Sequence, residues 1–232
     1  APPAPVHLAP AVASYVGGDI ASGVLCTGLA REQDEVELFI DIGTNGEIVC
    51  GNREFLMTCA CSAGPAFEGG GVTQGMRAAP GAVEEVAIDG ATGRPSWKTV
   101  DDRPPRGICG TGLLSLIANL FSTGWLEPNG KFPRERTCEW ICREGREASY
   151  EICSAAETGI DGPLRVSERD IESLLRAKAA VYAACALMLE NVGLGFDDLQ
   201  TVYIAGAFGH FLDLEDAVKI GLLPDSGGKV II

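Results

Sequence analysis

The sequence is poor in basic residues and in long apolar runs, and each shortage excludes a class of function. With 18 Lys and Arg against 32 Asp and Glu, the formal net charge is −14, whereas nucleic-acid-binding proteins need clustered positive charge. No apolar run reaches the roughly 18 residues of a transmembrane helix, and no basic segment precedes an apolar one as in a signal peptide. We therefore expect neither a nucleic-acid nor a membrane partner.

Cysteine is present but shows no disulfide pattern. The nine cysteines are an odd number without regular spacing, which favours free thiols in a reducing, cytoplasmic compartment over a disulfide scaffold. Two pairs, Cys59-x-Cys61 and Cys138-x₃-Cys142, have spacings that also occur in metal sites. No further Cys or His pair accompanies either of them, so a metal role is kept only as the less favoured alternative.

The remaining composition is that of a globular chain. Apolar residues make up 46% of the sequence and 30 residues are glycine, enough for a sizeable core with many tight turns. Residues 1–11, rich in proline and alanine, predict a linker, and residues 12–232 predict a domain with an irregular excursion at about 129–165. The linker-like start and a strand-like run at 229–232 predict a piece of a longer protein.

The periodicity of apolar residues predicts a mixed α/β fold. Three β-rich runs joined by turns, at 36–40, 47–50 and 54–59, predict an antiparallel meander. Apolar residues at helical spacing predict helices, and a continuous apolar run predicts a buried strand at 201–205. The expected helices cover residues 20–29, 113–121, 170–191 and 214–220, and Ser167 and Asp170 resemble a capping box before the third of them. Strand-like segments are expected near 138–142 and 150–153 within the excursion. This order of elements predicts a mixed sheet with helical cover.

The strongest functional signal is the run FIDIGTNGE at residues 39–47. A carboxylate, Asp41, ends an apolar strand, and a turn of glycine, threonine and asparagine follows. Such a turn can present backbone N–H groups and a hydroxyl to phosphate, and Asp41 then needs Mg²⁺ or its bound water in between. The alternative is a plain type I′ hairpin over Asn45 and Gly46, in which Asp41 only caps its own turn. Residue spacing alone supports phosphate binding and a plain hairpin equally.

A second signal is the run YIAGAFG at residues 203–209. It predicts a buried strand that ends in a flat glycine turn, against which a nucleoside can lie. By itself the pattern is more typical of a strand-to-helix turn without a ligand. Glycine clusters at 68–71 and 107–112 line the same cleft or only pack helices. Neither a P-loop nor a Gly-x-Gly-x-x-Gly motif is present, which excludes P-loop and Rossmann nucleotide sites.

Together these segments resemble a known family. FIDIGTNGE and YIAGAFG resemble a phosphate motif and the adenosine motif of the superfamily that groups acetate and sugar kinases, Hsp70 and actin (ASKHA). Over residues 12–232 the chain resembles more closely the C-terminal actin-like ATPase domain of the reductive activators of corrinoid proteins. The matching segments are 39–49, 59–70, 75–78, 107–113, 177–181 and 203–209. The resemblance implies a ribonuclease-H-like, actin-like α/β fold, here as a partial domain.

The resemblance also implies an activity. Members of this family use ATP to return an oxidised cobalt(II) corrinoid protein to cobalt(I) for methyl transfer. We therefore expect ATP and Mg²⁺ as ligands, a corrinoid protein as partner and a homodimer as a further possibility. Electrons would enter through a ferredoxin-like domain with a 2Fe–2S cluster. That domain and the second phosphate motif of the family are missing from this sequence.

Three functions follow from these expectations. The first is the ATPase part of such an activator, active in the full-length parent and inactive as this chain alone. The second is an acetate- or sugar-kinase-like phosphotransferase, and the third is a non-catalytic domain that docks a corrinoid protein.

The family's site residues are carried over position by position. Asp41 would hold Mg²⁺, directly or through water, Glu47 would steady the hairpin or the metal shell, and Glu68 is a further catalytic candidate. The nucleotide-binding candidates are Gly43, Thr44, Asn45, Gly46, Gly69, Gly70, Gly110, Thr111, Gly112, Gly206, Ala207, Phe208 and Gly209. Such phosphoryl chemistry relies on positioning rather than on a strong nucleophile. His7 lies in the linker, and His210 is expected in a turn or at the surface.

Overall fold

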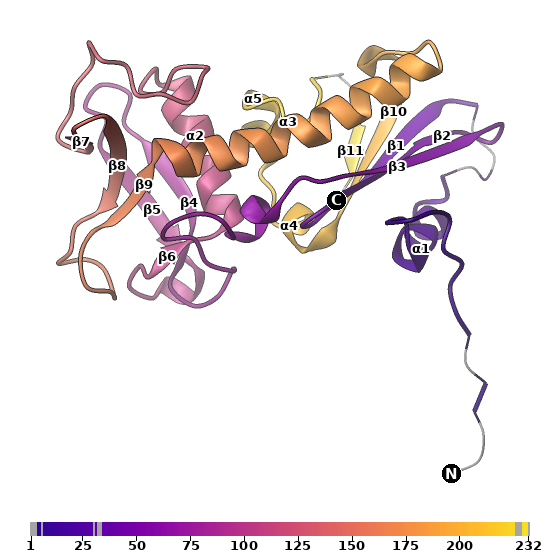
Figure 1. Ribbon diagram of the computed structural model, residues 1–232, viewed down its shortest axis with the longest axis horizontal. Coiled ribbons are helices and arrows are strands. Elements are labelled where there is room, and N and C mark those ends of the chain that lie inside the picture. The colour runs from indigo at the N-terminus through magenta and orange to yellow at the C-terminus, as the bar shows by residue number, and fades with distance from the viewer. Residues whose placement is uncertain (1–3, 6, 30, 32–33, 226–228, 232) are drawn as a thin grey trace.

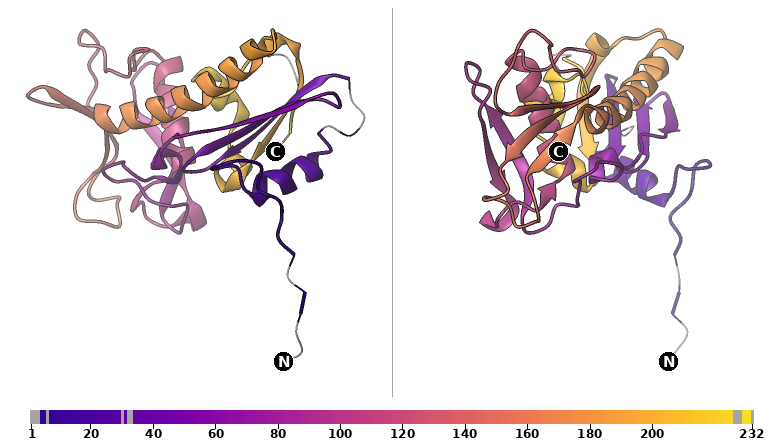
Figure 2. Two further views of the ribbon diagram at one scale, coloured as in Figure 1. Left: turned by 45° about the vertical axis from the view of Figure 1, so that its right-hand side comes forward. Right: turned by 60° about the vertical axis from the view of Figure 1, so that its left-hand side comes forward.

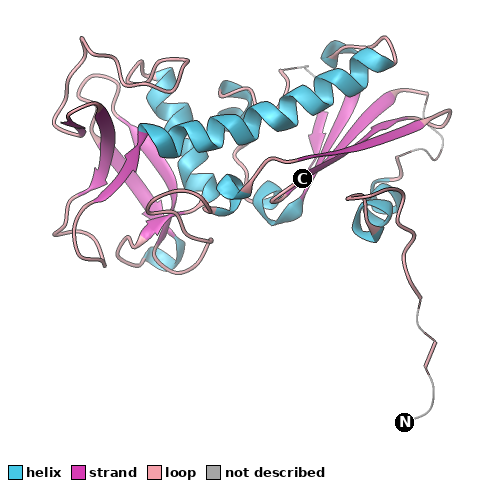
Figure 3. Cartoon of the chain, viewed as in Figure 1, coloured by secondary structure: helices cyan, strands magenta, loops and turns pink. Residues whose placement is uncertain are grey.

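The computed structural model describes residues 4–5, 7–29, 31, 34–225 and 229–231. Figure 1 labels its helices and strands and Figure 3 colours them by type. The helices are α1 (Gly18–Thr27), η1 (Pro65–Glu68), η2 (Val100–Asp102), α2 (Gly110–Ser122), α3 (Glu168–Asn191), η3 (Phe196–Asp198), α4 (Gly206–His210) and α5 (Leu214–Lys219). The strands are β1 (Val36–Ile42), β2 (Gly46–Gly51), β3 (Leu56–Cys61), β4 (Ala82–Ile88), β5 (Pro95–Thr99), β6 (Gly107–Ile108), β7 (Ile141–Glu144), β8 (Glu147–Cys153), β9 (Leu164–Ser167), β10 (Leu199–Ala205) and β11 (Lys229–Ile231).

A five-stranded sheet in the order β11-β10-β1-β2-β3 carries both sequence motifs. β1, β2 and β3 form the expected antiparallel meander, while β10 pairs in parallel with β1 and with β11. Alternate residues of a strand point to opposite faces, and both faces of β1 are covered. Leu38 and Ile40 belong to the main core beneath α3, whereas Phe39 packs with Ile20 of α1 on the other face. The α1 and α3 helices accordingly flank this sheet (Figure 1).

Two smaller sheets lie at the other end of the molecule (Figure 2). The first has the order β5-β4-β6 and packs against α2, and the second is the antiparallel sheet β7-β8-β9. The second sheet includes strands expected near 138–142 and 150–153, so the segment 129–165 is more ordered than an irregular excursion. Its Tyr150 is fully buried and donates its hydroxyl to the carbonyl oxygen of Gly93 over 2.6 Å. This bond links the two smaller sheets.

The long helix α3 spans both ends of the molecule and begins where the sequence predicts. Ser167 is its N-cap, and the predicted capping box with Asp170 is present. The Asp170 carboxylate is 3% exposed and accepts four hydrogen bonds, from the N–H and hydroxyl groups of Ser167 and of Thr73. Because Thr73 belongs to the loop after η1, this carboxylate fastens that loop to the start of α3.

Several local expectations are wrong. The first hairpin has a three-residue loop, residues 43–45, because Ile42 pairs with Gly46. A type I′ turn needs positive φ at its central residues, and neither Asn45 nor Gly46 has it. The third strand is β3, two residues later than expected, since the Asn52 side chain accepts from the N–H groups of residues 54 and 55 and holds a turn there.

The third difference concerns residues 206–209. They do not form a flat glycine turn but the first residues of the short helix α4. The 20–29 helix is likewise shifted, since α1 starts at Gly18 and ends before the left-handed Gly28. The helix expected at 113–121 starts at Gly110, so the glycines of the 107–112 cluster are part of β6 and α2.

Candidate functional site

The two strongest sequence signals meet at one end of the five-stranded sheet. β1 and β10 are parallel neighbours, and Asp41 of β1 is in register with Ala205 of β10. The 43–45 loop and α4 therefore leave the sheet side by side (Figure 1). Gly206 has a φ of +91°, and a Cβ atom there would lie 2.7 Å from Asp41 Oδ1. Only glycine allows this backbone conformation and this close approach to the carboxylate.

Hydrogen bonds within the 43–45 loop and to neighbouring segments fix its conformation. The Gly64 N–H donates to the Thr44 carbonyl oxygen over 2.9 Å, and the Gly43 N–H donates to the Asn45 carbonyl oxygen over 2.9 Å. The Thr44 hydroxyl donates to Glu68 Oε1 over 2.8 Å. Thr44 is exposed, so its hydroxyl lies on the open side of the loop, next to the carboxylate of η1. The predicted site residues Thr44 and Glu68 thus come together.

An apolar cleft of about 530 Å³ opens between η1, the start of α2 and α4. The rings of Phe67 and Phe208 pack there with their centroids 4.8 Å apart. Its lining residues are Phe67, Glu68, Arg77, Ala78, Glu84, Val100, Cys109, Gly110, Thr111, Ala207, Phe208 and Phe211. A concave, aromatic-lined site with a few polar groups at its rim is typical of small-molecule binding. Five predicted positions line it: Glu68, Gly110, Thr111, Ala207 and Phe208.

The glycines of the candidate set have two different environments. A Cβ atom at Gly110 would lie 1.8 Å from the Phe67 carbonyl oxygen, so the start of α2 contacts η1 backbone to backbone. Further positions in the set would also place a Cβ within 3.0 Å of a neighbouring atom; these are Gly46, Gly69, Gly70, Gly112 and Gly209. Gly43 differs, because the nearest atom would be 3.7 Å away. A side chain at Gly43 would therefore meet only ordinary van der Waals contacts, whereas the other glycines are packed too closely against neighbouring atoms to carry one.

Three carboxylates lie close enough together at this end of the sheet for their charges to interact. Asp41 and Glu47 are paired residues on β1 and β2, and Asp19 lies in the first turn of α1. Burial raises the pKa of the Asp41 carboxyl, and the charge of Asp19 raises it further. Burial also raises the pKa of Glu47, followed by the charges of Asp41 and Asp19. Among the described residues, no Lys or Arg forms an ion pair with any of the three.

This arrangement fits a magnesium ion held mostly by phosphate and water. Within the part of the chain that the structure describes, no group of three or more His, Cys, Asp or Glu side chains is placed to hold a metal ion. Mg²⁺ usually takes one or two protein carboxylates together with waters and substrate phosphates. Asp41 has no hydrogen-bond donor among the described residues and stands beside the open loop, which suits that role.

Neither cysteine pair lines the cleft, although Cys61 of β3 is paired with Gly46 of β2. Cys59 and Cys61 of β3 are half-buried beneath α3, and burial raises the pKa of each thiol. Cys59 Sγ is 3.1 Å from the sulfur of Met188 on α3. Cys138 and Cys142 are free thiols in and near strand β7 of the β7-β8-β9 sheet. These positions assign the two pairs to packing around helix α3 and the β7-β8-β9 sheet.

Sequence reasoning missed several residues of the site. Arg77 and Glu84 line the cleft, but only Arg77 falls in a segment that carries the resemblance, and no signal marks Glu84. Phe211 lines the cleft while 67% exposed, and it packs edge-on against the exposed His210. Asp19 faces Asp41 only because α1 folds back over β1. Tertiary contacts alone bring these residues to the site.

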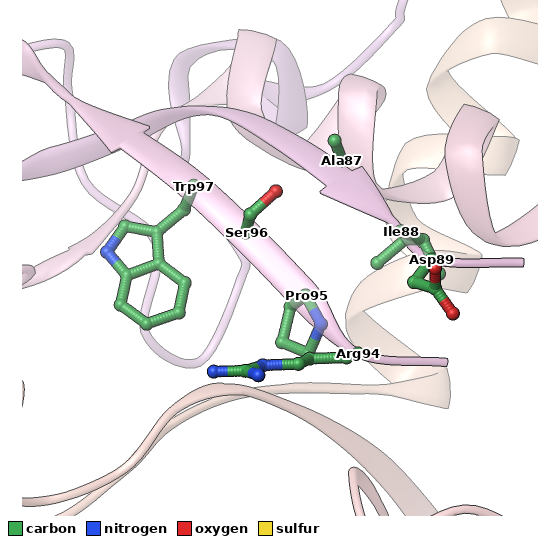
Figure 4. A pocket seen from close by; sticks show the side chains of 7 residues that line it. All are labelled: Ala87, Ile88, Asp89, Arg94, Pro95, Ser96 and Trp97. Carbon is green, nitrogen blue, oxygen red and sulfur yellow. The ribbon is translucent and has the colours of Figure 1, made fainter. Parts of the chain in front are cut away.

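A separate, open hollow lies away from both motifs (Figure 4). It follows the ends of β4 and β5 and is lined by Ala87, Ile88, Asp89, Arg94, Pro95, Ser96 and Trp97. None of these belongs to the predicted set, and a Thr92 hydroxyl and N–H already satisfy the Asp89 carboxylate. The motif-bearing cleft is therefore the stronger candidate site.

A comparison with protein-family models decides the family. Residues 35–231 match the model described as the C-terminal domain of RACo, the ASKHA domain. The chain belongs to this family. Its fold is accordingly the expected actin-like ASKHA α/β fold, with the meander and α3 of this chain as parts of that domain. The resemblance that the motifs carry is confirmed.

Individual proteins agree with the family. The chain is 34% identical to the corrinoid activation enzyme RamQ of Eubacterium limosum, over 98% of this chain and 39% of that protein. It is 28% identical to the Co(II) methylated amine-specific corrinoid protein reductase of Methanosarcina barkeri, over 96% of this chain and 41% of that protein. A solved structure of a reductive activator for a corrinoid, iron–sulfur protein superposes with a TM-score of 0.87 at 48% identity, over 96% of this chain and 36% of that one.

The chain thus spans about two fifths of the length of these relatives. In the described residues, no helix is both long enough and apolar enough to cross a bilayer.

Proposed function

We propose that this chain is the nucleotide-binding part of an ATP-dependent reductive activator. Its full-length parent would return an oxidised cobalt(II) corrinoid protein to cobalt(I), the state that accepts a methyl group. Electrons would reach the cobalt through a 2Fe–2S domain of the parent. The relatives named above act on corrinoid proteins by their printed names, and family membership favours this function over an acetate or sugar kinase.

One observation carries the nucleotide part of the proposal. The open 43–45 loop and the apolar cleft at Phe208 lie at the same end of one sheet, joined through the contact of Gly206 with Asp41. A polar loop next to an apolar, aromatic cleft matches the two halves of a nucleotide, a charged phosphate tail and a planar base. The structural match to a reductive activator extends over nearly the whole chain, which supports the proposal.

Each residue of the site then takes a role. Asp41 would hold Mg²⁺ directly or through water, with Glu47 supporting the water shell, since hard oxygen ligands suit this ion. Gly43, Thr44 and Asn45 would contact phosphate oxygens, and Glu68 would hold the Thr44 hydroxyl in place. The base and ribose would lie against the cleft formed by Thr111, Ala207 and Phe208. The packed glycines at 46, 69–70, 110, 112, 206 and 209 would set the backbone shape around the ligand.

The chain's carboxylates suit phosphoryl chemistry better than nucleophilic catalysis. No Ser-His-Asp arrangement is built around the site in the described residues, and His210 is exposed and packs edge-on against Phe211. Phosphoryl transfer depends on positioning and charge stabilisation. Because this chain carries one phosphate motif and the family uses two, hydrolysis is expected of the full-length parent rather than of this chain alone.

The test is ATP-dependent reduction by the full-length parent carrying Asp41→Asn. We expect loss of most of the ATPase activity and of the ATP-dependent decrease in cobalt(II) absorbance, by about 100-fold or more, as for removal of a key electrostatic group. Asp197→Asn, at an exposed position on η3, is the matched control and should keep both activities. Unchanged reduction with Asp41→Asn would remove the metal role assigned to this carboxylate. ATP hydrolysis that proceeds normally with no effect on cobalt would favour the phosphotransferase alternative.

A further inference from the structure

A second, polar hollow continues the candidate cleft. It has a volume of about 480 Å³ and lies along β4, α2 and the segment 210–216. Glu84, Thr111 and Phe211 line both hollows, so the cleft and the second hollow share one border. Carboxyl, amide and hydroxyl side chains make up most of the remaining lining of the second hollow. Among the described residues, Arg77 is the only Lys or Arg that lines either hollow, and it lines the cleft alone.

A β-bulge brings Glu84 to this border. Val83 and Glu85 of β4 pair with adjacent residues of β5, so Glu84 is the extra residue between them. Val86 and Ile88 are buried in the core, and strict alternation along the strand would turn residue 84 to the same side. Instead, Val83 is buried, while Glu84 and Glu85 are both exposed. Because a bulge re-aims the side chains of its strand, it keeps Glu84 out of the core and beside the cleft.

Glu84 also differs from the other carboxylates of the two hollows. The other four each have a hydrogen-bond or ion-pair partner in the chain: Glu68 with the Thr44 hydroxyl, Glu85 with Lys98, Asp213 with the Asp216 N–H, and Asp216 with Lys219. In the described part of the chain, Glu84 forms no ion pair. Its carboxylate is therefore the one that is left to accept from a ligand.

The two hollows also give a nucleotide one orientation. Glu68, which accepts from Thr44 of the 43–45 loop, lines the cleft but not the second hollow. Glu84 lies at the border between the two. A nucleotide with its phosphates at the 43–45 loop would therefore extend its base toward Glu84, with the ribose in between. The reverse orientation would bring the phosphates to the carboxylates of the second hollow, which repel them.

We propose that Glu84 selects adenine by accepting a hydrogen bond from the amino group at C6 of the base. This inference rests on the proposed function, which supplies ATP as the ligand. Guanine and hypoxanthine carry a carbonyl oxygen at C6, an acceptor where adenine has a donor. A carboxylate that faces this oxygen can form no hydrogen bond with it and repels it. A site built around one polar contact rejects the analogue that lacks it.

The experiment measures the binding of ADP and of inosine diphosphate (IDP) to the full-length parent by calorimetry with Mg²⁺ present. Diphosphates avoid hydrolysis during the titration, and IDP carries hypoxanthine in place of adenine. We expect the native parent to bind ADP about tenfold or more tightly than IDP. Glu84→Ala should weaken ADP binding about tenfold and change IDP binding by less than about threefold, so that the preference disappears.

Glu85→Ala is the matched control. Glu85 is the neighbouring residue of the same bulge, is also exposed, and pairs with Lys98 rather than facing the cleft without a partner. The two variants remove one negative charge each. Glu85→Ala should keep the preference for ADP within about twofold of the native value. Circular dichroism of both variants verifies that the fold is retained.

The results that contradict this role can be told apart from a failure of the proposed function. Equal affinity of the native parent for ADP and IDP, or an unchanged preference in Glu84→Ala, would overturn the role of Glu84 and leave the nucleotide site in place. Equal weakening of ADP and IDP by Glu84→Ala would assign the carboxylate to the ribose and also overturn it, as would tighter binding of GDP than of ADP. Binding of none of these nucleotides would overturn the proposed function as well.

Discussion

Two aspartates of this chain, Asp170 and Asp41, lie near the ends of structural elements but differ in their hydrogen-bond partners. Asp170 lies in the first turn of α3 and accepts four hydrogen bonds from Ser167 and Thr73. Asp41 is the last residue but one of β1, lies near two other carboxylates and has no donor among the described residues. A saturated carboxylate stabilises its own fold, whereas one left without partners costs stability and can meet an external ligand. The number of hydrogen-bond donors around the carboxylate therefore distinguishes a structural aspartate from a candidate functional one, which residue type alone does not.

Removal of the saturated carboxylate should have the largest effect on stability. Asp170→Ala leaves the partly buried N–H groups of Thr73 and Ser167 without their acceptor, so we expect a loss of about 3 kcal/mol in the free energy of unfolding. Urea denaturation measures it. Asp198→Ala is the matched control, since Asp198 accepts one exposed bond from Gly195, and it should lose less than about 1 kcal/mol. Equal losses from the two variants would contradict the account of Asp170.

The next largest effect compares two glycines of the candidate site. Gly206→Ala forces a side chain into positive φ and against Asp41 Oδ1, so we expect a loss of about 2 kcal/mol in stability. Gly43→Ala has room for its Cβ and should change stability by less than about 1 kcal/mol. Under the proposed function, Gly43→Ala should nevertheless weaken nucleotide binding by the full-length parent, as measured by calorimetry. Normal binding by Gly43→Ala would remove the phosphate contact at this position.

A smaller effect of opposite sign is expected for Asp41→Asn. Folding raises the pKa of Asp41, so the folded state holds the proton more tightly than the unfolded state does. Stability therefore falls as pH rises from the usual carboxyl pKa through the raised value. Asp41→Asn removes this contribution to the pH dependence of stability, and we expect the melting temperature at pH 7 to rise by roughly 1–3 °C. Melting curves between pH 4 and pH 8 test this. A lower melting temperature for Asp41→Asn at pH 7 would show that the carboxylate stabilises the fold.

The smallest stability effect is expected for Thr44→Val. The bond from the Thr44 hydroxyl to Glu68 is exposed, and its loss should cost less than about 1 kcal/mol. If the hydroxyl serves the ligand, nucleotide affinity of the parent should fall by about fivefold or more, the cost of one hydrogen bond. Thr201→Val, at a half-buried position on β10 outside the site, is the matched control. An affinity change equal in both variants would argue against a direct role for Thr44.

The sequence anticipated much of the fold, because its strongest patterns are local. The capping box at Ser167, the α3 helix, the meander and the continuous apolar strand β10 all follow from periodicity and short-range hydrogen bonds. The expectations were wrong where a side-chain hydrogen bond or the register of a strand pair determines the structure. The Asn52 side chain moved the start of β3, and pairing of Ile42 with Gly46 lengthened the first loop.

The residues of the candidate site likewise fall into those that sequence patterns marked and those that only the tertiary structure revealed. Asp41, Thr44 and Phe208 lie in runs with recognisable spacing, so residues alone marked them. Sequence left open whether Gly110 lines the cleft or only packs a helix, and the structure shows both, since Gly110 lines the cleft and contacts Phe67 backbone to backbone. Glu84 and Asp19 had no signal, because each reaches the site from an element that sequence order places elsewhere. No local pattern encodes such a contact.

The sequence by itself determined the family, the two motifs and the amphipathic elements, because these depend on residue type and spacing within one segment. Only the tertiary structure decided that the 43–45 loop and α4 share one end of a sheet, through the parallel pairing of β1 with β10. It also decided which glycines are packed and which carboxylates are left without partners. Parallel pairing joins segments about 160 residues apart, and hydrogen-bond satisfaction depends on every atom that folding brings near.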